Sequence, residues 1–285
     1  MQREKPFVYI DTNFSLGERL MLKLAFNTFD FEIVGISTVS SAMDAKVAAE
    51  NIVGMSEIED LYLSVCQGEN VNLKGQEILL KEKNEKIFAN VKDYVEDENA
   101  IKNLYDLAKD CGRLDIITTS PLTNIAKALR EYDDLEDYIS HIFILGASFS
   151  AGDVTSDAEY NFFTDPIAAD EIFNRGIDIF LLPIDLSKSV VLNDAMLDQL
   201  KDSDQVTKTI LDDYRKSPEE LRDLGPALLL YLVLTPEAFI FEEDGLSVNT
   251  KEQRGKVYRT NKRKKVYIAN RVNENSFFEF IKATL

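Results

Sequence analysis

Polar and acidic side chains follow the ends of several apolar, strand-like runs, and these are the residues that could do chemistry. Asp11 and Asn13 follow the first run, "FVYI", and Asp153, Glu159 and Asn161 follow a later one, "HIFILG". Carboxylates and amides can bind a metal ion or hold the hydroxyl groups of a ligand. In open α/β sheets such sites lie at the carboxyl ends of the strands. The pattern therefore indicates a polar site there, although an exposed loop would carry the same residue types.

Several other kinds of site are not indicated by the residues present. The chain has one histidine, His141, and two cysteines, Cys66 and Cys111. A lone histidine at the start of a strand favours a structural role, and both serine and cysteine catalytic triads need a histidine. The cysteines lack zinc-site spacing, so we expect reduced thiols. No glycine-rich phosphate-binding loop follows a strand.

Composition and charge limit the partners that we expect. The 285 residues are 45% hydrophobic, which is enough for a single domain over residues 1–285. The formal net charge of -18 repels phosphate backbones and anionic lipids, so nucleic acid and membranes are not expected partners. The N-terminal residues lack a signal-peptide-like apolar run, and we expect a cytoplasmic protein.

Strand-like and helix-like segments alternate through the first two thirds of the chain. Strand candidates are residues 7–11, 32–39, 61–66, 114–119, 141–146 and 177–183, and helix candidates are 17–27, 43–56, 92–109, 122–132 and 166–174. This alternation predicts an α/β fold with an open, mostly parallel central sheet and helices on both faces. A mostly helical part to about residue 234 follows, then strand candidates at 238–242, 256–259 and 266–269 and a last helix at 274–283.

Four segments, in order, resemble the inosine-uridine-preferring nucleoside hydrolase family. "IDTNFSLGERLMLKLAF" is similar to the family's D-T-D-P-G-x-D-D motif and the apolar helix after it, and "FEIVGISTVSSAMDAKVAAENI" resembles its second strand and helix. "IITTSPLTNIAKALR" is similar to G-P-L-T-N-x-A-x-A, and "GASFSAGDVTSDAEYNFFTDPIAAD" resembles M-G-G-x…A-E-F-N-x-x-x-D-P-E-A-A. The resemblance covers nearly the whole chain. It implies the family's fold, its homo-oligomeric assembly and its hydrolysis of ribonucleosides at the N-glycosidic bond with a bound calcium ion.

The opening motif is changed where the resemblance assigns the metal site. The second aspartate of the motif, a metal ligand and general base, falls on Asn13, and a ribose-contact aspartate falls on Gly17. The next metal ligand falls on Glu18, and the ligand carbonyl before the P-L-T-N helix falls on Thr118. An amide cannot accept a proton at neutral pH, so Asn13 cannot act as the base.

The late part of the family's site is changed as well. A histidine that protonates the leaving base and an aspartate that binds the metal fall on Leu224 and Gly225, with a local shift to Asp223 as the alternative. Calcium needs about six to eight oxygen ligands and several negative charges. We therefore expect no calcium cofactor. If the assignment is right, Asn13→Asp together with Gly225→Asp should improve calcium binding.

The residues that the resemblance assigns to ribose binding agree better with the family's motif. Glu159 and Asn161 match the family's glutamate and asparagine, and Asp153 stands where an asparagine is usual. Glu159 and Asn161 are two residues apart, so in an extended segment they would point to the same side.

Three interpretations of function remain open. The first is a nucleoside hydrolase-like protein that lacks the calcium-dependent N-ribohydrolase activity and retains nucleoside or ribose binding. The alternative is an active ribonucleoside N-glycosidase with an altered metal site, and a third is a different reaction built on acids at the strand ends, namely Asp11, Glu18, Asp153 and Glu159. A pocket plugged by Phe14 or Arg19 would favour the first interpretation.

Overall fold

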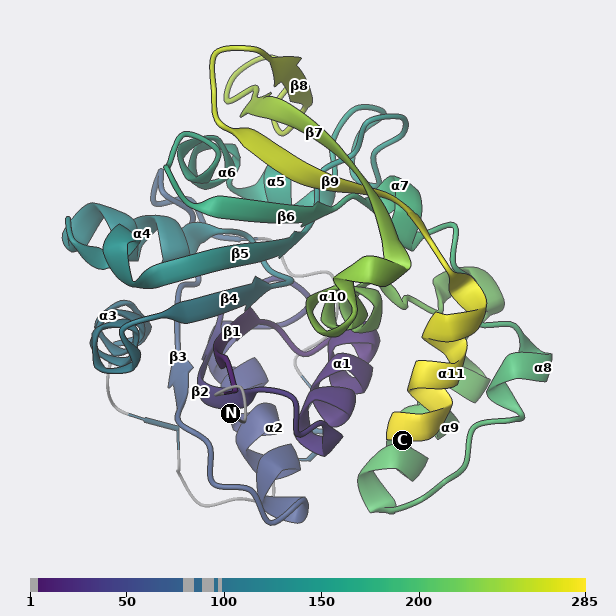
Figure 1. Cartoon of the computed structure of the whole chain (residues 1–285). Coiled ribbons are helices and arrows are strands. Elements are labelled where there is room, and N and C mark those ends of the chain that lie inside the picture. The colour runs from purple at the N-terminus through teal and green to yellow at the C-terminus, as the bar shows by residue number, and fades with distance from the viewer. Residues whose placement is uncertain (1–4, 79–84, 89–94, 97–98) are drawn as a thin grey trace.

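A nine-stranded, mostly parallel sheet forms the centre of the computed structural model, which describes residues 5–78, 85–88, 95–96 and 99–285. The strands are β1 (Phe7–Thr12), β2 (Glu32–Thr38), β3 (Val65–Gln67), β4 (Leu114–Thr118), β5 (Ile139–Leu145), β6 (Asp178–Leu182), β7 (Phe239–Val248), β8 (Val257–Thr260) and β9 (Lys265–Val272). Their order is β3-β2-β1-β4-β5-β6-β9-β7-β8, and only the pairs of β7 with β8 and with β9 are antiparallel among the described strands (Figure 1). The predicted fold class is confirmed.

Helices cover both faces of the sheet. They are α1 (Leu16–Asn27), α2 (Ala45–Ile58), α3 (Ala100–Cys111), α4 (Thr123–Glu131), α5 (Tyr160–Thr164), α6 (Pro166–Ile172), α7 (Ile184–Ser187), α8 (Asp194–Leu197), α9 (Gln205–Lys216), α10 (Gly225–Leu234) and α11 (Glu274–Thr284). One hydrophobic cluster joins the sheet to α1, α2, α9, α10 and α11, and a second joins it to α3, α4 and α6. Figure 1 shows α3, α4 and α6 apart from α1, α10 and α11.

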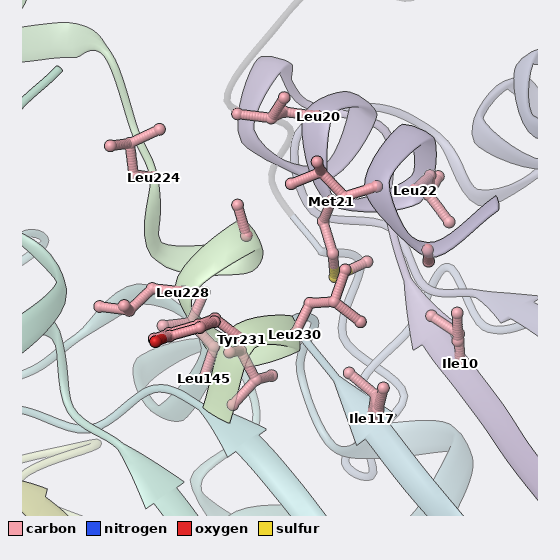
Figure 2. Packing of buried hydrophobic residues seen from close by; sticks show 14 of the residues in the cluster. Ile10, Leu20, Met21, Leu22, Ile117, Leu145, Leu224, Leu228, Leu230 and Tyr231 are labelled. Carbon is pink, nitrogen blue, oxygen red and sulfur yellow. The ribbon is translucent and has the colours of Figure 1, made fainter. Parts of the chain in front are cut away.

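Alternation along the strands sends side chains into both clusters. In β5, Ile142 and Ile144 belong to the cluster under α3, α4 and α6, whereas Phe143 and Leu145 belong to the other. Figure 2 shows α10 between α1 and the strands, with Leu228 near Leu145. The helix α10 is buried almost throughout, which accounts for its continuous apolar sequence.

Two strands differ from the sequence prediction. The strand expected at 61–66 is the three-residue β3, because α2 runs on to Ile58 and Asp60 then adopts a left-handed turn with φ 56°. The strand expected at 238–242 is the ten-residue β7. Its acidic middle looks unlike a strand, but Glu242 and Asp244 pair across the sheet with Arg259 of β8.

Two helical predictions also need correction. The helix expected at 92–109 begins at Ala100, where Asn99 caps it, and Glu96 forms a parallel bridge to Cys66 instead of lying in a helix. Residues 92–94 and 97–98 of that prediction lie outside the described residues. The segment around Glu159 is not extended, because Glu159 is the N-cap of the short helix α5.

The basic run "RTNKRKK" covers the end of β8, the connection that follows it and the first residue of β9. Most of its cations pair with acids of this chain. Arg263 lies 2.9 Å from Asp170, and Lys264 lies 2.9 Å from Asp178. These ion pairs give the run a structural role at this edge of the sheet.

No helix within the described residues has the length and apolar character needed to cross a bilayer.

Candidate functional site

A pocket of about 540 Å³ lies at the carboxyl ends of the parallel strands. Its walls come from segments that are distant in sequence. Glu18 comes from α1, Thr119 follows β4, Glu159 lies between β5 and α5, Lys188 follows α7, and Leu224 precedes α10. The structure thus brings most of the expected residues to one cavity at the place that the strand pattern predicted.

Asn13 is buried beneath this pocket, with no exposed surface. Its Nδ2 donates hydrogen bonds to the carbonyl oxygens of Val39 (2.6 Å) and Met43 (3.0 Å). Its Oδ1 accepts from the N–H groups of Phe14 (2.8 Å) and Met43 (3.1 Å). The amide therefore uses both donors and both acceptor positions on backbone groups, and Asn13 is not among the pocket-lining residues.

The first turn of α1 carries Gly17 and Glu18 to the pocket wall. Glu18 is 7% exposed, and its Oε2 accepts a hydrogen bond from the N–H of Ser15 (2.9 Å) as part of a capping box. A Cβ atom on Gly17 would lie 3.0 Å from Cδ of Pro226. A side chain at position 17 would therefore be packed tightly against the start of α10.

Asn161 and Thr119 lie together at the base of the pocket. Nδ2 of Asn161 donates to the carbonyl oxygens of Thr119 (3.0 Å) and Leu145 (3.3 Å), and neither bond uses its Oδ1. Thr119 lines the pocket, whereas Thr118 is fully buried and is not among the lining residues.

Glu159 is 4% exposed and is held by backbone N–H groups on three sides. Its Oε1 accepts from Asn161 (2.8 Å), and its Oε2 accepts from Phe162 (3.1 Å) and Ala147 (3.2 Å). These bonds fix the orientation of the carboxylate. Glu159 therefore connects the end of β5 to α5 while it lines the pocket.

Asp153 lines the outer part of the pocket, in the loop between β5 and α5. Its Oδ2 lies 3.9 Å from Nζ of Lys188, whose side chain is 56% exposed. A pair this long and this exposed contributes little to stability. Asp153 is therefore the least constrained of the three residues expected to bind the ligand.

Leu224 and Gly225 stand at the start of α10. Leu224 is 2% exposed, and Figure 2 shows it on the segment that leads into the helix. A Cβ atom on Gly225 would lie 3.0 Å from Oδ1 of Asp223 and 3.2 Å from Leu145. Oδ1 of Asp223 also accepts from the Gly225 N–H at 2.8 Å, so Asp223 contributes to the turn before α10.

Phe14 and Arg19 do not plug the pocket. Phe14 is fully buried and packs edge-on against Phe88, with ring centroids 6.0 Å apart. Arg19 forms an ion pair with Asp213 at 2.8 Å. Neither side chain is among the pocket-lining residues, so the cavity remains open to a ligand.

Asp11 is fully buried and separated from the pocket wall. Its Oδ1 accepts from Oγ of Ser37 (2.5 Å) and Nδ2 of Asn124 (2.7 Å), whereas Oδ2 has no hydrogen-bond partner among the described residues. Burial raises the pKa of Asp11 from 3.8 to about 7, although these two hydrogen bonds oppose the rise. Because Asp11 does not reach the cavity, a reaction built on it is not supported.

His141 has a structural environment. Its Nδ1 lies 2.8 Å from Oδ1 of Asp115 on the neighbouring strand β4, and the hydrogen bond to Asp115 raises the pKa of His141. His141 is not among the pocket-lining residues. The sequence prediction of a structural role agrees with this position.

Arg222 is a pocket residue that the sequence did not single out. Its side chain is 4% exposed, and its guanidinium donates to the carbonyl oxygens of Tyr214 (2.9 Å), Ser217 (3.1 Å) and Leu192 (3.1 Å). It also pairs with Asp194 at 2.7 Å. Arg222 thus joins the segment before α10 to the end of α9 and to residues 192–194, and its contacts could not be inferred because they come from segments 5 to 30 residues away.

The residues present do not fit the calcium ion that the resemblance implies. Both acceptor positions of Asn13 are occupied by backbone N–H groups, and Gly225 has no side chain. The Thr119 carbonyl already accepts a hydrogen bond from Asn161. Glu18 is the one carboxylate at the directly aligned positions, and the local shift would add only Asp223, whose Oδ1 accepts from the Gly225 N–H. Within the described parts of the chain, no group of three or more His, Cys, Asp or Glu residues could hold a metal ion.

Comparison with known proteins assigns the family. Residues 8–279 match the family described as inosine-uridine preferring nucleoside hydrolase. The chain belongs to this family. A probable uridine nucleosidase 1 of Oryza sativa subsp. japonica is 26% identical over 71% of this chain and 65% of its own length. The match thus spans slightly under two thirds of that relative.

Other nucleoside hydrolase family members agree with this assignment. A probable uridine nucleosidase 2 of Arabidopsis thaliana is 25% identical over 87% of this chain and 83% of its own length. The structure of a purine-preferring ribonucleoside hydrolase from Gardnerella vaginalis superposes with a TM-score of 0.88 at 19% identity, covering 98% of this chain and 97% of that one. This likeness confirms the fold of the family.

Proposed function

We propose that this family member binds a nucleoside or another ribose-containing ligand without the family's calcium-dependent N-ribohydrolase activity. Glu159 and Asn161 would hold the ligand's hydroxyl groups, and Asp153 would add a contact at the outer part of the pocket. We also propose, by the family resemblance, a cytoplasmic homo-oligomer. An active N-glycosidase with an altered metal site is the alternative.

The start of α10 carries this proposal. The two positions that the resemblance assigns to the leaving-group acid and to a metal-binding aspartate are Leu224 and Gly225. An isobutyl side chain cannot donate a proton, and glycine cannot bind a cation through a side chain. An acid does lie close to this point, because Oδ1 of Asp223 would be 3.0 Å from a Cβ atom on Gly225. The same oxygen accepts a hydrogen bond from the Gly225 N–H, and we infer that this carboxylate serves the turn before α10.

The remaining polar groups are suited to binding. Oε1 of Glu159 accepts a hydrogen bond from the N–H of Asn161, and a carboxylate oxygen can accept more than one. Oδ1 of Asn161 is not used by the two bonds that orient the side chain. Both can therefore accept hydrogen bonds from ribose hydroxyl groups, and the preformed carboxylate and amide give these bonds a fixed geometry.

The first prediction is that little or no free base is released from inosine, uridine, adenosine or cytidine, with or without calcium. Water must lose a proton and the leaving base must gain one, and neither Asn13 nor Leu224 can exchange protons at neutral pH. Loss of general acid–base help costs about 10²-fold or more per group. Chromatographic detection of the free base is the measurement. Turnover near about one per second, abolished by Glu159→Ala, would favour the alternative.

A further inference from the structure

The buried amide of Asn13 connects two segments that border the pocket. One is the turn between β1 and α1, which contains Asn13 itself, and the other is the loop between β2 and α2. The hydrogen bonds to Val39 and Met43 span 26 and 30 residues of sequence. They join the ends of two adjacent parallel strands just below the cavity.

An amide fits this position and a carboxylate does not. Nδ2 faces two carbonyl oxygens at 2.6 Å and 3.0 Å, whereas Oδ1 faces two N–H groups. An aspartate would place an oxygen against the carbonyls of Val39 and Met43, with no proton between them when ionised. Because the site is fully buried, water cannot relieve that repulsion.

The loop that Asn13 holds forms one wall of the pocket. Ser41 and Ala42, between the two anchor points at Val39 and Met43, are both pocket-lining residues. The hydroxyl group of Tyr160 donates to the Ser41 carbonyl at 3.3 Å, which links the same loop to α5 beside Glu159. The position of this wall relative to Glu159 therefore depends on the Asn13 amide.

We propose that Asn13 is a positioning residue whose amide assembles the pocket wall without a metal ion. It joins by hydrogen bonds the segments that a metal ligand at this position would otherwise help to fix. The substitution Asn13→Asp would thus remove structural hydrogen bonds and would not restore a metal site. This inference concerns how the pocket is built, and its test below uses no nucleoside, so it can fail independently of the proposed function.

The test compares Asn13→Asp with Asn273→Asp by thermal unfolding at pH 8, with and without millimolar calcium. Asn273 is the exposed N-cap of α11, and its Oδ1 only accepts a hydrogen bond, so aspartate can replace it. Asn13→Asp should lower Tm by roughly 4–8 °C and calcium should not restore it, whereas Asn273→Asp should change Tm by less than about 1 °C. An unchanged Tm for Asn13→Asp, or recovery with calcium, would overturn the proposal.

A local measurement separates positioning from general stability. Hydrogen exchange followed by mass spectrometry should show faster exchange for residues 39–45 in Asn13→Asp, while peptides from β5 and β6 keep their protection. If Asn13→Asp does not fold, Asn13→Ala decides the question, because it removes both donors without adding a charge. If residues 39–45 exchange at the same rate in Asn13→Ala as in the unaltered protein, the positioning role of Asn13 is refuted.

Discussion

Replacing Lys23 by alanine is expected to lower the free energy of unfolding by about 3–5 kcal/mol. The Lys23 side chain is 2% exposed, and its Nζ lies 2.5 Å from Oε2 of Glu59 and 2.9 Å from Oδ2 of Asp204. The ammonium group joins α1 to the end of α2 and the start of α9. Its removal leaves two acids without their shared cation, Glu59 with a side chain that is 14% exposed and Asp204 with one that is 37% exposed, and it also leaves the space of the buried Lys23 side chain unfilled.

The pKa of Asp204 reflects its hydrogen bonds to Lys23 and to the start of α9. Burial alone would raise the pKa of Asp204, but hydrogen bonds from the Thr207 N–H and from Lys23 outweigh it and lower the pKa to about 2. A depressed carboxyl pKa adds stability above the ordinary value near 4, and that stability is lost as pH falls toward 2. The Lys23→Ala effect should therefore be measured near pH 7, where the pair is fully ionised.

Denaturant unfolding of Lys23→Ala and Lys216→Ala provides the comparison. Lys216 lies 3.2 Å from Asp213, but its side chain is 75% exposed, so its loss should cost less than about 1 kcal/mol. Adding Glu59→Gln to Lys23→Ala should recover part of the loss, because one uncompensated charge is removed. Equal effects of the two lysine substitutions would show that the buried network does not stabilise the fold.

Replacing Asp11 by asparagine is expected to change the pH dependence of stability. The pKa of Asp11 is raised by burial from 3.8 to about 7, so between about pH 4 and 7 the folded protein holds a proton that the unfolded chain has lost. The contribution of Asp11 to the free energy of unfolding therefore falls as pH rises from about 4 to 7 and is constant above that range. The difference between the two pKa values corresponds to about 4 kcal/mol.

The measurement is the free energy of unfolding of both proteins from pH 4 to pH 8. Asn at position 11 keeps an acceptor for Ser37 and Asn124 but adds a buried N–H, which gives an offset that does not vary with pH. Relative to the unaltered protein, Asp11→Asn should gain up to about 4 kcal/mol between pH 4 and pH 8. A difference that stays flat across this range would mean that Asp11 ionises normally in the folded state.

The sequence predicts the fold well because its main signal is local. Short apolar runs separated by helical periodicity specify a parallel sheet with covered faces, and all nine strands begin within four residues of their expected positions. The prediction ends β7 too early, at residue 242 instead of Val248, because the acidic residues Glu242 to Asp244 look like a loop. Their partners, Arg259 and Lys265, lie in other strands. These ion pairs form only in the folded sheet, so the local sequence does not indicate them.

The candidate site is only partly predictable. The pattern placed Glu159 and Asn161 at the correct end of the sheet but assumed an extended segment, because nothing local signals a five-residue helix. The sequence also shows that Asn13 lacks a carboxylate. It does not show that the Asn13 amide is hydrogen-bonded to Val39 and Met43. The expectation that Asn13→Asp together with Gly225→Asp should improve calcium binding was made without these contacts and stays a prediction.

Calorimetric titration of inosine into the protein, in EDTA and again in millimolar calcium, tests the central claim most directly. If the pocket binds its ligand through Glu159 and Asn161 without a metal, the two titrations should give the same affinity and leave the inosine intact. Binding that appears only in calcium, or heat from continuous hydrolysis after each injection, would contradict the claim and restore the calcium-dependent reaction to this chain.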